Sequence, residues 1–147
     1  MASHDLTPIG RRPAAVTTAV WLLALGGLLL LAGGLIAATM SFEALRQAAP
    51  PTVSDAAVEE YARLYRGAGI LFAVAGAALT VFALRCRGRN QRVRRATMAL
   101  GLAIVVVVAV AAVFAGTHLL SLLSLLAIIA GTLLLSRPGV VEWYTGD

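Results

Sequence analysis

The sequence predicts an all-α integral membrane protein, built as a bundle of four transmembrane helices. Of its 147 residues, 60% are hydrophobic and only 13% are charged, about half the charged fraction of a typical soluble domain. The hydrophobic residues form four nearly continuous runs whose lengths suit a bilayer. Arginine gathers in short segments between the runs, as it does on the cytoplasmic side of membrane proteins. We expect one membrane domain spanning residues 1–147.

The first run covers about residues 14–40 and follows a polar arm, residues 1–13, which we expect to be flexible and cytoplasmic. The run is much longer than the apolar region of a cleaved signal peptide, so it is predicted to remain as a helix. Two pairs of glycines lie seven residues apart on one face, where a neighbouring helix can approach closely. They are Gly26, Gly27, Gly33 and Gly34.

Residues 41–63 form the largest hydrophilic segment and are expected to be an outer loop. The pair Pro50–Pro51 ends any preceding helix, whereas Thr52 or Ser54, followed by acidic residues, is a helix-start signal. We therefore predict a short amphipathic extracytoplasmic helix that runs into the second transmembrane helix, at about 64–84.

The second transmembrane helix carries a stripe of small residues at a spacing of three or four. Such a stripe indicates close helix–helix contact, and a ligand groove is the alternative interpretation. The stripe consists of Gly69, Ala73, Gly76, Thr80 and Ala83.

The arginine-rich segment 85–95 holds half of the basic residues and precedes the third helix, predicted at about 96–116. Asn90 is placed to cap that helix. We expect a cytoplasmic loop that contacts anionic lipid headgroups or a partner protein, although topology alone would explain the arginines. The segment has no aromatic residue for stacking on bases, which argues against nucleic acid. Its arginines are Arg85, Arg87, Arg89, Arg92, Arg94 and Arg95.

The fourth helix is predicted at about 119–135, after a tight turn at 116–118. Its polar face carries Ser121, Ser124 and Thr132. The tail, residues 136–147, is expected on the cytoplasmic side, where Trp143 and Tyr144 return to the membrane interface.

The arginine count predicts the orientation of the chain in a plasma membrane. Placing both termini in the cytoplasm leaves three arginines outside, together with four acidic residues, and the other nine inside. An even number of helices is consistent with this arrangement. The outer arginines are Arg46, Arg63 and Arg66, and the inner ones are Arg11, Arg12, Arg137 and the six of segment 85–95.

The sequence offers no constellation of residues for catalysis. No ionisable residue lies in the middle of any apolar run, although pumps and coupled transporters usually need one there. The single cysteine, Cys86, cannot form an internal disulfide or a zinc site, and His4 and His118 lie outside the runs. We therefore expect no enzymatic activity, no metal and no cofactor.

Three short stretches resemble a group of small, uncharacterised four-helix integral membrane proteins of actinobacteria. They are RPAAVTTAVWLLAL at the first helix, GRNQRVRRATMAL at the third, and LLLSRPGVVEWYTGD at the end of the fourth. The resemblance implies the same four-helix topology, and it implies no activity or catalytic residue.

Two functions are compatible with these features. The first is a structural or regulatory accessory protein that packs, through its small-residue faces, with itself or with a larger membrane complex. The second is a small transporter or channel component that uses the hydroxyl groups of the fourth helix. A water-filled cavity lined by those hydroxyls would favour the second function, and a closely packed interior the first.

Overall fold

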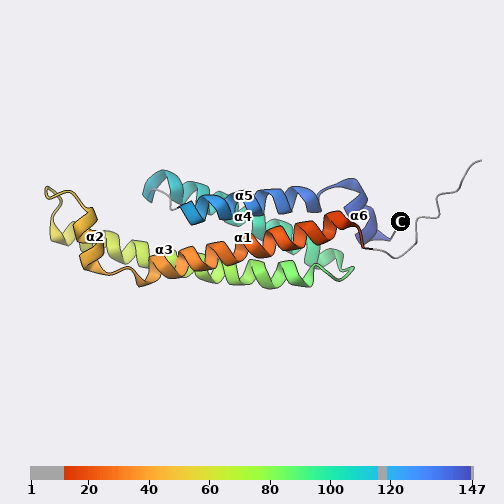
Figure 1. Ribbon diagram of the computed structural model, residues 1–147, viewed down its shortest axis with the longest axis horizontal. Helices are drawn as coiled ribbons and strands as arrows, with labels where there is room; N and C mark the ends of the chain where they lie inside the picture. The colour runs from red at the N-terminus through yellow and green to blue at the C-terminus, as the bar shows by residue number, and fades with distance from the viewer. Residues whose placement is uncertain (1–11, 116–118, 147) are drawn as a thin grey trace, which may run out of the picture.

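The computed structural model describes residues 12–115 and 119–146, whose regular elements are all helices (Figure 1). Four long helices run side by side, while two short ones lie at opposite ends, which we call the α2 end and the α6 end. The expectations for residues 1–11 and for the turn at 116–118 lie outside the described residues. The helices are α1 (Ala14–Thr39), α2 (Phe42–Ala48), α3 (Asp55–Arg85), α4 (Gln91–Ala115), α5 (Leu119–Leu135) and α6 (Pro138–Thr145).

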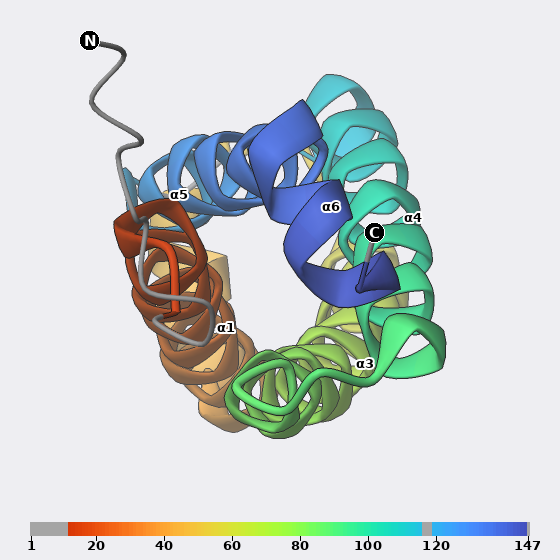
Figure 2. The same cartoon turned by 90° about the vertical axis from the view of Figure 1, so that its right-hand side faces the viewer.

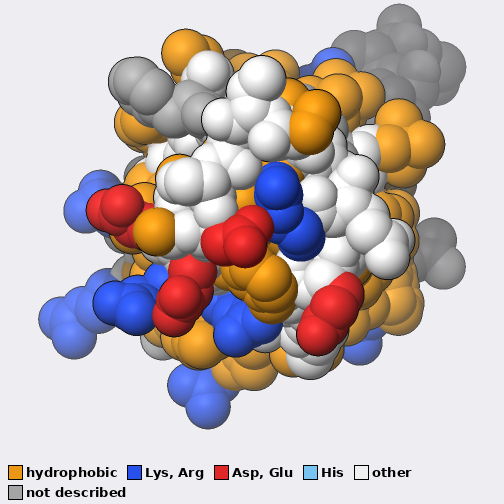
Figure 3. All heavy atoms as spheres, turned by 90° about the vertical axis from the view of Figure 1, so that its left-hand side faces the viewer, with side chains coloured by type: hydrophobic (Ala, Val, Ile, Leu, Met, Phe, Trp, Pro, Cys, Tyr) orange, Lys and Arg blue, Asp and Glu red, His pale blue; other side chains and the backbone are white. Residues whose placement is uncertain are grey.

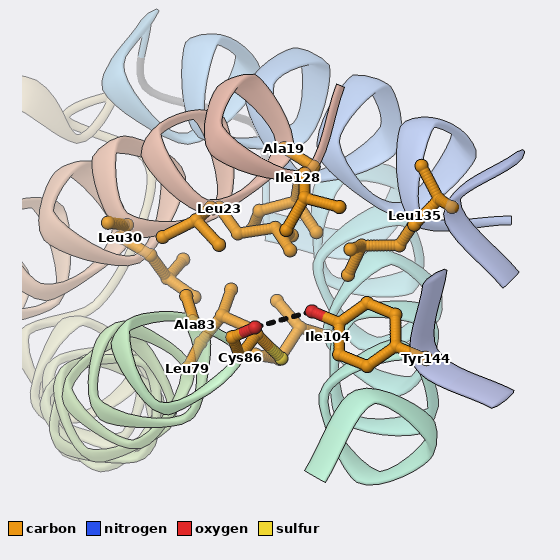
Figure 4. Close-up of a cluster of buried hydrophobic side chains, with 14 of the residues drawn as sticks. Ala19, Leu23, Leu30, Leu79, Ala83, Cys86, Ile104, Ile128, Leu135 and Tyr144 are labelled. Carbon is orange, nitrogen blue, oxygen red and sulfur yellow. Dashed lines mark hydrogen bonds between the residues drawn. The ribbon is translucent and has the colours of Figure 1, made fainter. Parts of the chain in front are cut away.

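Seen from the α6 end, the long helices form a ring in the order α1, α3, α4, α5, and α6 lies across it (Figure 2). α1 packs mainly against α3 and α5, and α4 packs against the same two helices from the other side. Buried side chains from these helices and from α6 meet in one hydrophobic cluster, much of it drawn in Figure 4. The predicted all-helical bundle is therefore confirmed for the described residues. Members of the cluster include Leu23, Leu30, Leu79, Ile104, Ile128 and Leu135.

Three helices, α1, α3 and α4, are each long and apolar enough to cross a membrane. α5 has 17 residues and meets the same criterion only together with α6, from which it is bent by 62°. The bounds of α5 coincide with the predicted helix at 119–135. α1 ends one residue before the predicted helix at 14–40. The chain thus has three or four candidate membrane spans by length and composition.

The α2 end differs from the predicted outer loop. Ser41 and Ser54 each begin a helix, because their hydroxyl oxygens accept hydrogen bonds from the N–H groups of Ala44 and Ala57, both at 3.3 Å. The segment expected to form a short amphipathic helix running into the second transmembrane helix is the first part of α3, whereas α2 was not expected. One helix continues from Asp55 onward because no proline interrupts it.

Charged side chains of both signs lie close together at the α2 end (Figure 3). Arg46 Nε lies 2.7 Å from Asp55 Oδ1, which holds the start of α3 beside α2. Arg66 Nε donates to the carbonyl oxygen of Met40 at 3.1 Å, which ties α3 to the end of α1. Arg46 and Arg66 therefore contact neighbouring groups of the same chain, although Arg46 Nη1 is buried without a hydrogen-bond partner among the described residues. Its acidic residues are Glu43, Asp55, Glu59 and Glu60.

The connection between α3 and α4 is shorter than the predicted loop 85–95, because only residues 86–90 lie outside both helices. Asn90 Oδ1 accepts hydrogen bonds from the N–H groups of Arg92 at 3.0 Å and Val93 at 3.4 Å, and so caps α4 as expected. Half of the arginine segment therefore projects from the rigid first turns of a helix. The arginines placed in this way are Arg92, Arg94 and Arg95.

Candidate functional site

The six arginines predicted to contact lipid or a partner all lie at the α6 end, but they are not equivalent. Five of them have exposed side chains. Arg94, in contrast, is only 8% exposed. It projects from the first turns of α4 toward Tyr144 of α6, so the fold distinguishes one arginine in a segment whose six arginines looked alike in the sequence.

Cys86 and Thr97 form the floor of this site. Cys86 ends α3, and its side chain is fully buried. Its Sγ lies 3.0 Å from Thr97 Oγ1, and that hydroxyl donates in turn to the carbonyl oxygen of Val93 at 2.8 Å. Burial raises the pKa of the Cys86 thiol, with the Thr97 contact and the charge of Arg94 opposing this. The thiol therefore stays protonated and serves as a weak hydrogen-bond donor.

The roof of the site is α6, which the sequence analysis treated as part of a tail. Pro138 stands at the first position of this helix, where its missing N–H is not needed. Val140 and Tyr144 are the buried residues of α6, and Tyr144 Oη donates to the carbonyl oxygen of Cys86 (Figure 4). That bond satisfies a carbonyl at the C-terminal end of α3 and holds α6 across the bundle.

Arginine–aromatic pairs surround the site. The guanidinium carbon of Arg87 lies 5.0 Å from the centre of the Trp21 ring, and that of Arg89 lies 5.8 Å from the Trp143 ring. Arg89 Nε also donates to the carbonyl oxygen of Trp143 at 3.0 Å. Such pairs contribute about 0.5–1 kcal/mol each at exposed positions. They fasten α1 and α6 to the connection between α3 and α4.

Arg94 is the least well satisfied polar group of the site. Its guanidinium carbon lies 5.6 Å from the centre of the Tyr144 ring. Its Nε and Nη1 atoms are buried and have no hydrogen-bond partner among the described residues. An unpaired buried charge of this kind typically destabilises a protein by roughly 3–5 kcal/mol. The position near the N-terminus of α4 adds to this, since a helix N-terminus disfavours a cation.

Because Tyr144 is buried, its hydroxyl is expected to lose its proton at a higher pH than that of a free tyrosine. Burial, followed by the neighbouring Cys86, raises its pKa to about 12, whereas a free tyrosine ionises near pH 10. Between these values the unfolded chain has lost the proton and the folded chain still holds it. The stabilising contribution of Tyr144 is thus complete below about pH 10 and is lost as the pH rises through about 12.

The measurement is the ultraviolet absorbance of phenolate in the folded chain and in a Tyr144→Phe variant. The difference between the two curves should have its midpoint near pH 12. A midpoint near pH 10 would show that the ring is not covered by the bundle.

The small residues predicted for helix packing face α1 within the same chain. A Cβ atom on Gly69 would lie 2.6 Å from the backbone nitrogen of Ala38, and one on Gly76 would lie 2.5 Å from the carbonyl oxygen of Gly27. Thr80 lies at the same seam and donates to the carbonyl oxygen of Gly76 at 2.9 Å. Ala73 lies at the same contact, against Gly34 of α1, and Ala83, the last residue of the stripe, is fully buried.

Two of the three hydroxyl groups of α5, those of Ser124 and Thr132, donate hydrogen bonds within their own helix. Ser124 is fully buried, and its hydroxyl donates to the carbonyl oxygen of Ser121 at 2.7 Å. Thr132 donates to the carbonyl oxygen of Ile128 at 2.8 Å, and its oxygen lies against Gly101 of α4. These contacts are those of closely packed helices.

Sequence reasoning missed several members of the site. Arg12 donates to the carbonyl oxygen of Arg87 at 2.8 Å, although it lies 75 residues away in the chain. Trp21 and Thr97 looked like ordinary residues of the predicted helices. The aromatic pair Trp143–Tyr144 was the one signal in the tail, and it was interpreted as a contact with the membrane interface. In the described part of the chain, no group of three histidine, cysteine or acidic side chains is placed to hold a metal ion.

Comparison with protein-family models, curated proteins and solved structures found no match for the chain. The function is therefore inferred from the residues themselves.

Proposed function

We propose that the chain is a non-enzymatic, multi-pass protein of the plasma membrane that serves as a structural or regulatory partner in a larger membrane assembly. Its arginine-rich α6 end, with both chain termini, would face the cytoplasm. The three or four helices long enough to span a bilayer support the membrane location.

The observation that carries this proposal is an apolar groove between α3 and α4. It is open to the side of the bundle, and small side chains at Ala75 and Ala103 allow another helix to approach closely. The glycine seam of α1, in contrast, is already occupied inside the chain by α3. The remaining residues that line the groove are Leu71, Phe72, Ile104, Val107 and Val108.

The distribution of buried residues among the long helices also supports the groove between α3 and α4 as the contact surface for a partner. In its most apolar stretch, α1 has 44% of its residues buried inside the bundle, whereas α3 has 28% and α4 has 22%. Most residues in the apolar stretches of α3 and α4 are therefore at least partly exposed on the outside of the bundle. A transmembrane helix of a partner, or of a second copy, would find its complementary surface at the groove between them.

The test is gentle solubilisation, affinity capture of the full chain, and quantitation of co-purifying membrane proteins. Ala103→Phe fills the groove and should abolish stoichiometric recovery of a partner, whether a different protein or a second copy. Leu102→Phe is the matched control, because Leu102 is exposed on the same helix and does not line the groove. Isolation of the wild-type chain as a lone monomer under the same conditions would contradict the proposal.

A further inference from the structure

We propose that Arg94 is the receptor for a single phosphate group, which binds between the first turns of α4 and the overlying helix α6. The group belongs either to an anionic lipid headgroup or to free inorganic phosphate. This inference does not depend on the accessory role proposed above, because it concerns a different part of the bundle, but its lipid arm rests on the proposed membrane location.

The first argument is the state of the guanidinium group. Arg94 is more than nine-tenths buried, and its Nε and Nη1 atoms lack hydrogen-bond partners among the described residues. Buried polar groups in proteins are almost always paired, so an arginine in this state calls for an acceptor beyond the described residues, and we assign that acceptor to an anionic ligand. The ring of Tyr144 covers one side of the guanidinium group but supplies no acceptor in its plane.

The second argument is the charge around the group. In the described part of the α6 end, the only acidic residue is Glu142, which is exposed. Both ion pairs found among the described residues, Arg46–Asp55 and Arg63–Glu59, lie at the α2 end. The described charges of the α6 end are therefore mainly cationic, and Arg94 lies in the first turns of α4, at the positive end of that helix, so an anion is the ligand that this end attracts.

The third argument concerns the chemistry of the anion. A guanidinium group matches the geometry of an oxyanion and binds phosphate through paired, charge-assisted hydrogen bonds. The site also lies where α3 ends and α4 begins, both of which are long enough to span a bilayer. A headgroup phosphate lies at that depth, and a soluble phosphate reaches it from the aqueous side.

Because the Tyr144 ring of α6 lies against Arg94, an anion that reaches the guanidinium group must enter past this helix. This helix has eight residues and is held by the Tyr144 hydrogen bond to Cys86 and by the contacts of Arg89 with Trp143. Phosphate binding and the position of α6 are therefore coupled, so that a bound phosphate stabilises α6 in its place across the bundle.

The experiment measures thermal unfolding of the full chain in two arms. In the first, the protein in nonionic detergent without lipid is titrated with inorganic phosphate. In the second, it is placed in phosphate-free buffer in nanodiscs of phosphatidylcholine, with or without phosphatidylglycerol. Stabilisation in the first arm identifies free phosphate as a ligand, and stabilisation by phosphatidylglycerol alone identifies a lipid headgroup.

Arg94→Gln and Arg92→Gln are the matched variants, since each removes one positive charge from the start of α4 but only Arg94 is buried. Arg92→Gln should retain the stabilisation. Arg94→Gln should weaken the apparent affinity on the order of tenfold or more. Without phosphate or anionic lipid, Arg94→Gln should be at least as stable as the wild type, because it removes an unpaired buried charge.

A purely structural role for Arg94 makes the opposite prediction: Arg94→Gln would be less stable in every condition and would respond to phosphate like Arg92→Gln. That result, or the absence of any response of the wild type in both arms, would overturn the proposal. Arg94→Lys provides a second variant if the glutamine variant does not fold. This lysine variant keeps the charge but loses the planar guanidinium group with its paired N–H donors. It should therefore also bind phosphate more weakly than Arg92→Gln.

Discussion

Replacing Gly34 with alanine is expected to lower the free energy of unfolding by about 1–3 kcal/mol. The added Cβ would lie 2.5 Å from the backbone nitrogen of Ala73 and 2.6 Å from the carbonyl oxygen of Gly69. Both are backbone atoms of α3, so no side chain can rotate away and the two helices must separate. Alanine gains about 0.5–1 kcal/mol over glycine inside a helix, which offsets only part of this loss.

Gly67→Ala is the control, because Gly67 also lies inside a long helix but its added Cβ would have no neighbour within 4 Å. This variant should be as stable as the wild type or slightly more stable. The measurement is denaturant-induced unfolding in mild detergent, followed by the fluorescence of Trp21 and Trp143. Equal stabilities for the Gly34 and Gly67 variants would mean that α1 and α3 are not in the close contact described.

A cysteine introduced at position 88 is expected to be protected from a membrane-impermeant maleimide added to intact cells, and to react fully after permeabilisation. A cysteine introduced at position 52 should react in intact cells. Gly88 lies in the exposed connection at the α6 end and Thr52 is exposed at the α2 end, so both substitutions leave the bundle unchanged. The expected contrast is all-or-none because the bilayer blocks the reagent.

The wild-type chain is the background control, since its only cysteine, Cys86, is fully buried and its pKa is raised by that burial. Labelling of Gly88→Cys in intact cells, with Thr52→Cys protected, would reverse the orientation inferred from the arginines.

The ends of the helices show where a pattern of apolar residues stops being informative. Such runs record only the part of a helix that lies in an apolar environment, whereas the hydrogen-bonded helix continues until a cap or a proline ends it. The segment from Asp55 to Arg63 is polar, yet it belongs to α3. The start of α4 likewise precedes its apolar run, and Asn90, the residue that caps it, was the reliable signal.

The site at the α6 end was only partly predictable. The cluster of arginines was evident from the sequence, but nothing in the sequence distinguished Arg94 from Arg92 or Arg95. Arg94 differs from the other two because α6 lies across the ring of helices and its Tyr144 covers the side of α4 from which Arg94 projects. Membership of Arg12 and Cys86 in the same site depends on the ends of α1 and α3 being neighbours.

Local chemistry was therefore sufficient to predict four long apolar helices, the arginine cluster between the second and third of them, and the small residues that permit close contact. These properties depend on each residue and its nearest neighbours along the chain. The pairing of the α1 and α3 glycines, the covering of Arg94 by Tyr144 and the groove between α3 and α4 were settled only by the arrangement of the helices in space. Apolar helices resemble one another in composition, so the choice of neighbours depends on steric fit between faces that are distant in sequence.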